Sequence, residues 1–367
     1  MSESYTVNGY EAPVPTEYTK VTPLDDRHNA LCYRLVPIKG KNRQLGIFRD
    51  ADDHQQDLDA ATDVYNTKNW GSDYSNRRTV FSNSGEDLRD HGARLMDDGR
   101  IGCVFWREPD GETDDITFLY SDDGGDTWNS KSTGLTSPGP VKFIDRYPSS
   151  VGGDDDGGWI IYSNNSNYDI TYAYTTDNGD TWTTGTAISN STSADFFEPA
   201  VARISDEDKW VMVIRDNSGG TAWASKSTDM INWEDAVDTG QSMGGNPPLL
   251  YYFEDKLWWT VPSRIHLDKE IESFGDNIIH QTQDADTIWN DLTDWPGWAV
   301  FTEAEPGNTT YFDLQEVHGR RVLMGGINET FPDDAQGVVY KGRVDGNVGV
   351  TFDNVINSDD NYVVEAR

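Results

Sequence analysis

The chain has 367 residues and a formal net charge of −35 at pH 7, from 64 acidic against 29 basic side chains. Such an acidic excess excludes functions that need a basic face, so we expect no nucleic-acid partner. No apolar run approaches the ~20 residues that cross a bilayer, and we expect no membrane insertion. With 34 Gly, 13 Trp and 17 Tyr, the composition favours short strands joined by turns over helices.

The acidic residues are spread over the whole chain and are not gathered in a tail. Self-repulsion on this scale is tolerable when the Debye length falls to about 3 Å, at roughly 1 M salt. We therefore expect a high-salt environment, that of a halophile or of a virus of one. The alternative is a protein that is acidic merely for solubility.

The first segment, residues 1–28, has neither a basic nor an apolar signal region, so no signal peptide is expected. We interpret it as a leader or docking arm, residues 29–350 as the main domain, and residues 351–367 as a C-terminal closing segment. The two cysteines, Cys32 and Cys103, specify neither a disulfide framework nor a metal cluster. No cofactor and no metal are expected.

An acidic turn recurs along the chain. "SDDGGDTW" (121–128) returns as "TTDNGDTW" (175–182), with weaker copies "STDMINW" (227–233) and "TQDADTIW" (282–289). The last residues of these copies, tryptophans 128, 182, 233 and 289, are 54, 51 and 56 residues apart. The pattern suits a tight hairpin in which Asp accepts backbone N–H bonds and Gly takes a positive φ. The tryptophan is then expected to pack between neighbouring sheets.

Each turn follows a strand-like run, and an apolar segment precedes that run. The strand-like runs are 115–121, 169–175, 220–227 and 276–282, and the apolar segments are 100–106, 157–163, 209–215 and 256–262. Two further units, 33–49 and 314–329, fit the same template without a good turn. Six such units predict an all-β fold, a six-bladed β-propeller of four-stranded antiparallel blades.

The repeated turn resembles the Asp box, and roughly residues 30–345 resemble the sialidase (neuraminidase) superfamily of propellers. Other motifs follow in that family's order. They are "CYRLVPI" with Arg34, "FFEPAVARISDEDKWVMVIRD" with Glu198 and Arg215, "VPSRIHL" with Arg264, "TTYFDLQEV" with Tyr311, and "GINE" with Glu329. The proline of the first motif is displaced, and the interval from Arg264 to Tyr311 is longer than usual.

The resemblance implies that Arg34, Arg215 and Arg264 hold one carboxylate of an acidic sugar. Guanidinium forks can do this by bidentate bonds, which lysine cannot make. A tyrosine nucleophile avoids the repulsion that a carboxylate would meet, with a neighbouring Glu as its base.

Within that scheme Tyr311 would attack, Glu198 would take its proton, and Glu329 would brace Arg34. Asp59 is the best-spaced acid/base candidate, with Asp57 second. Each arginine could instead be an ordinary surface residue, and Tyr311 could simply pack.

Two functions are open at this stage. The first is a sialidase-like glycoside hydrolase acting on acidic sugars of cell-surface glycans. The second is a non-catalytic or weakly catalytic glycan-binding propeller, a receptor-recognition tail fibre of a halophilic virus. A viral protein would act in the virion or at the extracellular surface, within a virion or homo-oligomeric assembly. Otherwise we expect a cytoplasmic location.

Overall fold

A computed structural model describes the chain in segments between Tyr5 and Thr351. The described residues are 5–7, 10–12, 18–20, 31–39, 41, 43–51, 58–68, 73–96, 98–109, 115–136, 138–144, 158–204, 208–218, 220–242, 247–253, 255–262, 277–296, 299–302, 308–317, 320–328, 335–340, 343–345 and 349–351. Side chains are described only within residues 34–296.

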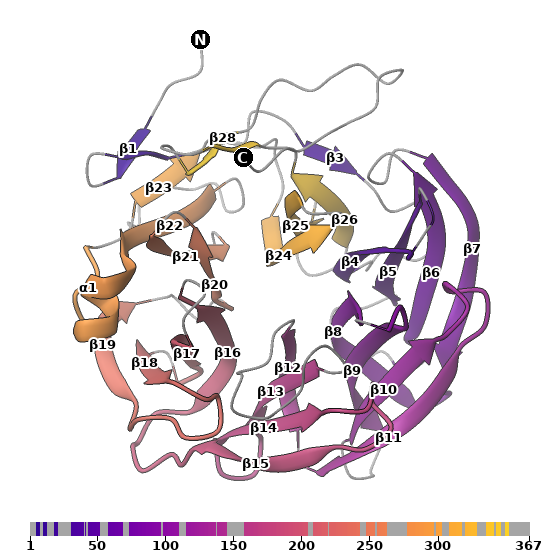
Figure 1. Cartoon of the computed structure of the whole chain (residues 1–367), viewed down its shortest axis with the longest axis horizontal. Helices are drawn as coiled ribbons and strands as arrows, with labels where there is room; N and C mark the ends of the chain where they lie inside the picture. The colour runs from indigo at the N-terminus through magenta and orange to yellow at the C-terminus, as the bar shows by residue number, and fades with distance from the viewer. Residues whose placement is uncertain are drawn as a thin grey trace.

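Six four-stranded antiparallel sheets surround a common centre (Figure 1), so the predicted six-bladed β-propeller is confirmed. Blade one contains β4 (Leu31–Pro37), β5 (Gln44–Asp50), β6 (Ala61–Lys68) and β7 (Asp73–Ser82). Blade two contains β8 (Glu86–Leu95), β9 (Ile101–Pro109), β10 (Asp115–Ser121) and β11 (Asn129–Thr136). Blade three contains β12 (Pro138–Ile144), β13 (Gly158–Asn164), β14 (Ile170–Thr175) and β15 (Thr183–Ile188).

The other three blades complete the ring. Blade four contains β16 (Phe196–Arg203), β17 (Trp210–Asp216), β18 (Thr221–Ser227) and β19 (Val237–Ser242). Blade five contains β20 (Leu249–Phe253), β21 (Lys256–Pro262), β22 (Asn277–Asp284) and β23 (Ala299–Thr302). Blade six contains β24 (Asn308–Val317), β25 (Arg320–Asn328), β26 (Ala335–Tyr340) and β3 (Tyr18–Lys20). Outside the blades, β1 (Tyr5–Val7) pairs with β2 (Tyr10–Ala12) and β27 (Arg343–Asp345) with β28 (Gly349–Thr351).

Blade six is closed by the beginning of the chain. Its outermost strand, β3, pairs antiparallel with β26, far away in sequence (Figure 1). A domain boundary at residue 29 leaves β3 outside the propeller, so the predicted leader is corrected: part of it belongs to a blade. Of the expected closing segment 351–367, only Thr351 lies within the described residues.

Apolar side chains fill the spaces between consecutive blades, and each repeated tryptophan enters one of these clusters. Trp128 packs between blades one and two, Trp182 between two and three, Trp233 between three and four, and Trp289 between four and five. The ring centroids of Trp182 and Phe118 lie 5.5 Å apart, edge to face. The predicted inter-sheet role of these tryptophans is confirmed.

The first acidic turn is a closed hydrogen-bond network. Asp123 Oδ1 accepts the backbone N–H groups of Asp126 and Thr127, each at 2.9 Å, and Asp123 Oδ2 accepts the Thr127 hydroxyl at 2.6 Å. Asp177 makes the same two kinds of bond with Thr181, each at 2.7 Å. Gly179 has φ +86° and faces the Phe118 ring, so a side chain there would meet both backbone strain and a clash.

The weaker copies differ from the first two. Met230 stands where Gly stood, at φ +57°, although Asp229 still accepts the N–H groups of Ile231 and Asn232. The fourth copy is not a hairpin turn: it forms the helix α1 (Ala285–Asn290), for which Asp284 is the N-cap. The Asp284 side chain accepts the backbone N–H groups of Asp286 and Thr287 as a helix cap. In the described part of the chain no helix is long and apolar enough to cross a bilayer.

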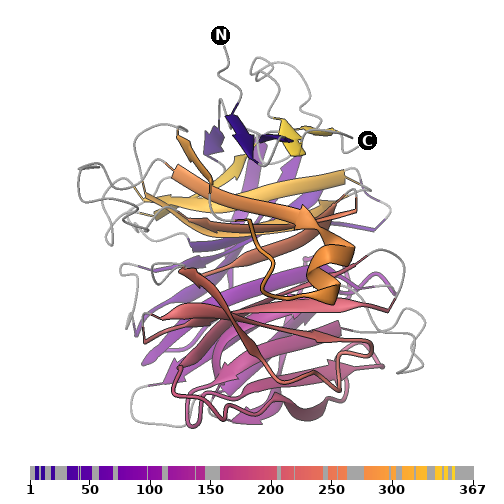
Figure 2. The same ribbon diagram turned by 90° about the vertical axis from the view of Figure 1, so that its left-hand side faces the viewer.

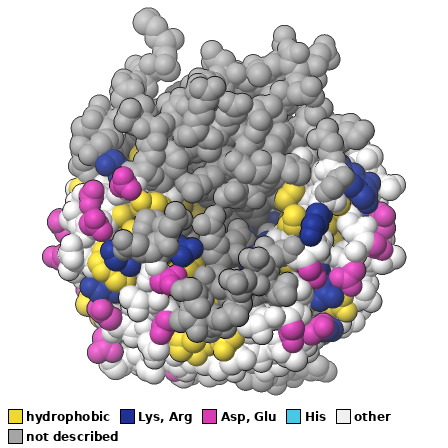
Figure 3. All heavy atoms as spheres, viewed as in Figure 1, with side chains coloured by type: hydrophobic (Ala, Val, Ile, Leu, Met, Phe, Trp, Pro, Cys, Tyr) yellow, Lys and Arg dark blue, Asp and Glu magenta, His cyan; other side chains and the backbone are white. Residues whose placement is uncertain are grey.

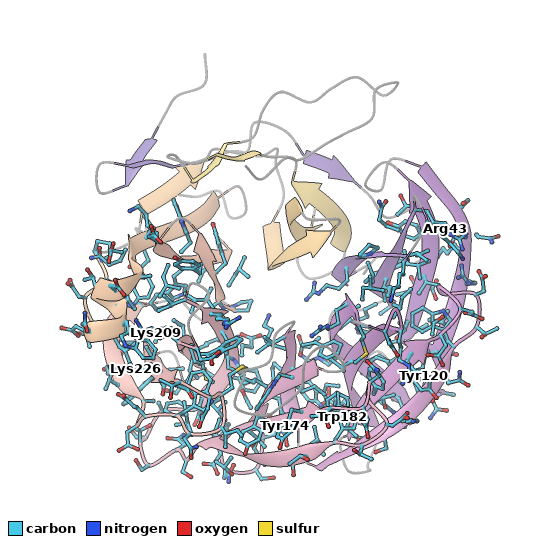
Figure 4. The ribbon with its side chains drawn as sticks, viewed as in Figure 1. Arg43, Tyr120, Tyr174, Trp182, Lys209 and Lys226 are labelled. Carbon is cyan, nitrogen blue, oxygen red and sulfur yellow. The ribbon has the colours of Figure 1, made fainter. Side chains whose placement is uncertain are left out.

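Helix α1 lies at the periphery of blade five (Figures 1 and 2). Beside it, Lys209 and Lys226 approach the Trp289 ring at 5.7 and 5.3 Å from its centroid (Figure 4). Acidic and basic side chains both appear along the described rim of the molecule (Figure 3). Many basic side chains among the described residues are paired with carboxylates, for example Arg100 with Asp122 at 2.7 Å.

Candidate active site

A β-bulge recurs in the inner strand of the blades. The register with the next strand shifts in β4, β8, β12, β16 and β24, between Leu31 and Arg34, Arg89 and Gly92, Pro138 and Val141, Phe197 and Ala200, and Thr310 and Asp313. A bulge breaks the alternation of side chains and re-aims one of them, which is why bulges are common beside active sites. Because inner strands occupy equivalent places around the centre, the bulged residues form one ring of positions.

Glu198 occupies the bulge of blade four. Its φ is +45°, an uncommon value for a residue with a side chain, and it is only 6% exposed. Arg215, near the end of the adjacent strand β17, donates from Nη1 to Glu198 Oε2. A buried carboxylate is costly without a partner, and this pair supplies one. Two of the predicted site residues are therefore in direct contact.

The remaining donors of Arg215 are only partly used. Its Nη2 donates to Asn217 Oδ1 at 2.8 Å, and its guanidinium lies 5.9 Å from the Phe197 ring centroid. Its Nε is buried and has no hydrogen-bond partner among the described residues. A guanidinium with an unused donor has capacity for a further acceptor.

Asp90 occupies the equivalent bulge of blade two, with φ +55°. Burial raises the pKa of its carboxyl to about 6, and the negative charge of Glu198 adds to the rise. Lys142, on β12 of the blade between them, and Arg89 oppose it. Two bulged carboxylates from blades two and four thus interact, and one of them has a pKa suited to proton transfer near neutral pH.

Asp90 was not predicted from the sequence. The segment "LRDHG", which contains Asp90, matches no motif. Asp90 is recognised only from the structure, where it occupies the same position in the bulge of β8 as Glu198 does in the bulge of β16.

A buried layer behind Asp90 fixes its strand. Arg49 Nη2 pairs with Asp87 Oδ1 at 2.6 Å, between blades one and two. His91 Nε2 lies 2.8 Å from the Thr62 hydroxyl. Burial, with the positive charges of Arg49 and Arg34, holds the pKa of His91 well below its ordinary value. His91 is therefore neutral at pH 7, and its contacts hold the bulge of blade two in place.

Arg34 and Tyr311 lie on neighbouring inner strands, β4 and β24, which are in contact. Arg34 is 5% exposed and directly follows the bulge of blade one. Tyr311 lies in the bulge of blade six, where only its backbone is described. Arg264, Glu329 and Asp57 lie outside the described residues.

No hydrogen bond or ion pair described in the structure joins Asp59 to Glu198 or Arg215. Asp59 is exposed, forms a backbone bridge with Glu86 at the start of blade two, and lines a cavity of 680 Å³ in blade one. Its role as acid/base stays a prediction. Within the described residues, no group of three or more His, Cys, Asp or Glu is placed to hold a metal ion.

Solved structures with the same fold include several glycosidases. No family model matches the chain, and no curated protein matches it. A Dyadobacter fermentans protein of unknown function matches with a TM-score of 0.62 and 15% identity, over 89% of this chain and 98% of that one. The Hadza microbial sialidase Hz136 matches with a TM-score of 0.58 and 16% identity, over 84% of this chain and 65% of its own.

A third match is the α-L-arabinofuranosidase Arb93A of Fusarium graminearum, solved as a mutant with an iminosugar inhibitor. Its TM-score is 0.56 and its identity 14%, over 88% of this chain and 97% of that one. At these identities the matches show the fold alone. The chain thus has the propeller fold that sialidases and at least one other glycosidase share.

Proposed function

We propose that the protein is a sialidase-like glycoside hydrolase acting on acidic sugars of cell-surface glycans. The observation that carries the proposal is the Glu198–Arg215 pair, held at a strained bulge in the inner ring. Backbone strain at a residue with a side chain persists only where its surroundings impose it, and active sites are one such place. Asp90, at the equivalent bulge, adds a second carboxyl whose pKa is about 6.

The chemistry assigns a role to each residue. Arg34, Arg215 and Arg264 bind the sugar carboxylate, and Glu329 braces Arg34. Glu198 takes the phenolic proton while the Tyr311 oxygen attacks the anomeric carbon, and Asp59 protonates the departing oxygen. Water then cleaves the tyrosyl–sugar bond, with Asp59 taking its proton and Glu198 returning one to Tyr311. The acidic turns serve as Asp boxes that stabilise the fold and take no part in this reaction.

The alternative is a glycan-binding propeller that cleaves slowly or not at all, such as the receptor-recognition protein of a halophilic virus. The Glu198–Arg215 pair fits this reading as well, since an ion-paired arginine can still orient a ligand without any bond being cleaved.

A glycan array in about 2 M KCl, followed by product analysis of every hit, tests the proposal. We expect binding of acidic glycans and release of the acidic sugar by the parent. Tyr311→Phe should bind the same glycans and release nothing, because only the attacking oxygen is lost. Equal turnover by Tyr311→Phe would remove Tyr311 as nucleophile. Binding without turnover by the parent would establish the alternative.

A further inference from the structure

Lys142 lies in the inner ring, on β12 of blade three. This strand contacts β8 and β16, the inner strands that carry Asp90 and Glu198 (Figure 1). Lys142 pairs across the sheet with Ile161, which packs between blades three and four. Residues directly opposite one another on neighbouring strands share a face of the sheet. Lys142 therefore points toward blade four, the blade of the Glu198–Arg215 pair.

The register gives Lys142 the same position in blade three that Arg34 has in blade one. Arg34 pairs with Ile47, the fourth residue of β5, and Lys142 pairs with Ile161, the fourth residue of β13. Ile47 packs between blades one and two, so both basic side chains face the next blade of the ring. Blade three thus adds a cation at the position from which Arg34 is expected to bind the sugar carboxylate.

The ammonium group of Lys142 is open to a ligand. The side chain is half-buried, and within the described part of the chain it makes no hydrogen bond and no ion pair. Its Nζ is not one of the buried polar atoms that lack a partner, so it keeps solvent-accessible surface. Among the other described lysines, only the Lys41 side chain is equally unpaired, and Lys41 is exposed on the loop between β4 and β5.

The neighbouring carboxylates do not engage this ammonium. Glu198 is already paired with Arg215. Asp90 is near enough for its charge to interact with that of Lys142, yet no ion pair joins these two described side chains. Burial raises the pKa of Asp90 to about 6 in spite of Lys142. A half-buried cation without a partner carries a desolvation cost, which a ligand anion would offset.

We propose that Lys142 binds a second anionic group of the glycan, a sulfate ester or the carboxylate of an adjoining acidic sugar. The inference rests on the function proposed above. One carboxylate has about four acceptor positions, which three guanidinium forks fill, so Lys142 requires another acceptor. Blade three supplies none of those arginines. Lysine is a compact charge with three rotatable donors, which suits a tetrahedral or a planar anion.

Titration calorimetry in about 2 M KCl with matched ligands tests the inference. Methyl α-sialoside and methyl β-glucuronide, with one carboxylate each, are compared with their O-sulfated forms and with the α2,8-linked sialic acid dimer. The parent should bind at least one doubly charged ligand about fivefold or more tighter than its singly charged counterpart. Lys142→Met, which keeps the length of the side chain and removes its charge, should reduce that preference to within about twofold.

Lys41→Met is the matched control, because it removes an equally unpaired lysine from an exposed loop. It should keep the full preference of the parent, and Lys142→Arg should keep most of it. The sulfated ligands and the dimer distinguish the two sources of the second charge. Thermal melts of each variant verify that the fold is intact.

Three results would overturn the inference. They are a parent without preference for any doubly charged ligand, a Lys142→Met variant that keeps the preference, and a Lys142→Met variant that binds both members of a pair equally more weakly, as a structural role would produce. A parent that binds none of these ligands would refute the proposed function as well.

Discussion

Glu198 and Asp90 are held at positive φ, which costs a residue with a side chain about 1–3 kcal/mol. The surrounding contacts impose this conformation: the Arg215 ion pair at Glu198, and the buried His91 beside Asp90. Sequence motifs identified Glu198 and Arg215 because "EPAV" and the strand ending in Arg215 are local patterns. The sequence did not identify Asp90 as a site residue. The groups that surround Asp90 come from blades one, three and four, and no local sequence pattern indicates that they meet there.

Asp90→Asn tests that environment through pH. The pKa of Asp90 is raised from 3.8 to about 6, so the fold favours the protonated carboxyl. That stabilisation is complete below about pH 4 and is lost as the pH rises through about 6. Asparagine cannot ionise and tolerates positive φ, so the variant should gain stability over the parent between pH 4 and 7, on the order of 1–3 kcal/mol.

Thermal or urea unfolding of both proteins across this pH range measures the difference. Asp180→Asn is a suitable control, since the pKa of Asp180 is lowered, chiefly by its hydrogen bond with Lys131, and not raised. Stability curves of parent and Asp90→Asn that stay parallel from pH 4 to 7 would show that Asp90 is not desolvated.

At the scale of elements, the acidic turn is an independent stabilising unit. Burial raises the pKa of Asp123, but hydrogen bonds from Thr127, Ser121 and the Asp126 backbone outweigh it and lower the pKa to about 2. The stability from this carboxylate is therefore present above about pH 4 and is lost as the pH falls toward 2.

Asp123→Ala should destabilise the protein by about 1–2 kcal/mol at pH 7, because several donors of the turn lose their acceptor together. Asp126→Ala is the matched control. It lies in the same turn, and its exposed side chain forms a 3.7 Å pair with Arg43 and no hydrogen bond of the Asp123 network, so its effect should stay within about 0.5 kcal/mol. Denaturant unfolding compares the two, and equal losses would refute the role given to the Asp123 network.

Much of the architecture could be predicted from the sequence because the repeat is local. The runs 115–121 and 256–262 coincide with β10 and β21, and those at 169–175 and 209–215 lie within one residue of β14 and β17. The closure of blade six could not be predicted. It depends on three residues, Tyr18–Lys20, which pair with a strand more than 300 positions away and carry no pattern of their own.

The fourth repeat shows the limit of such patterns. "TQDADTIW" keeps the Asp and the Trp, but its backbone continues as α1, whereas the third copy, which also lacks Gly, still turns at Met230. The sequence did not predict the β-bulges either, since an extra residue in a strand changes the register of the strand without changing its composition. The site therefore rests on features that only the assembled ring brings together.

At the scale of the whole molecule, the net charge of −35 must be accommodated by a single propeller. Many basic side chains among the described residues are paired with carboxylates, as Lys131 is with Asp180. Because the chain has 64 acidic and 29 basic side chains, most carboxylates have no basic side chain to neutralise them. The repulsion between these carboxylates is long-ranged at low salt.

We therefore expect the thermal midpoint to rise continuously from about 0.1 to 2 M KCl, as the Debye length falls from about 10 Å to below 3 Å. Sulfate at matched ionic strength is the control, because it also strengthens apolar burial. A thermal midpoint that changes by less than about 3 °C over this range of KCl would contradict the proposed high-salt environment. It would not bear on the fold or on the candidate site.

The central claim is that Arg215, held by Glu198 in the inner ring, binds the carboxylate of an acidic glycan. Titration calorimetry in about 2 M KCl, with the acidic glycan selected on the array, measures it most directly. Arg215→Lys should weaken binding by more than about tenfold, because one ammonium cannot replace a two-point fork. Arg203→Lys, at the far end of β16 and paired with Asp208 at 3.0 Å, should bind as the parent does. An unchanged dissociation constant for Arg215→Lys, or no acidic glycan bound by the parent, would contradict the account.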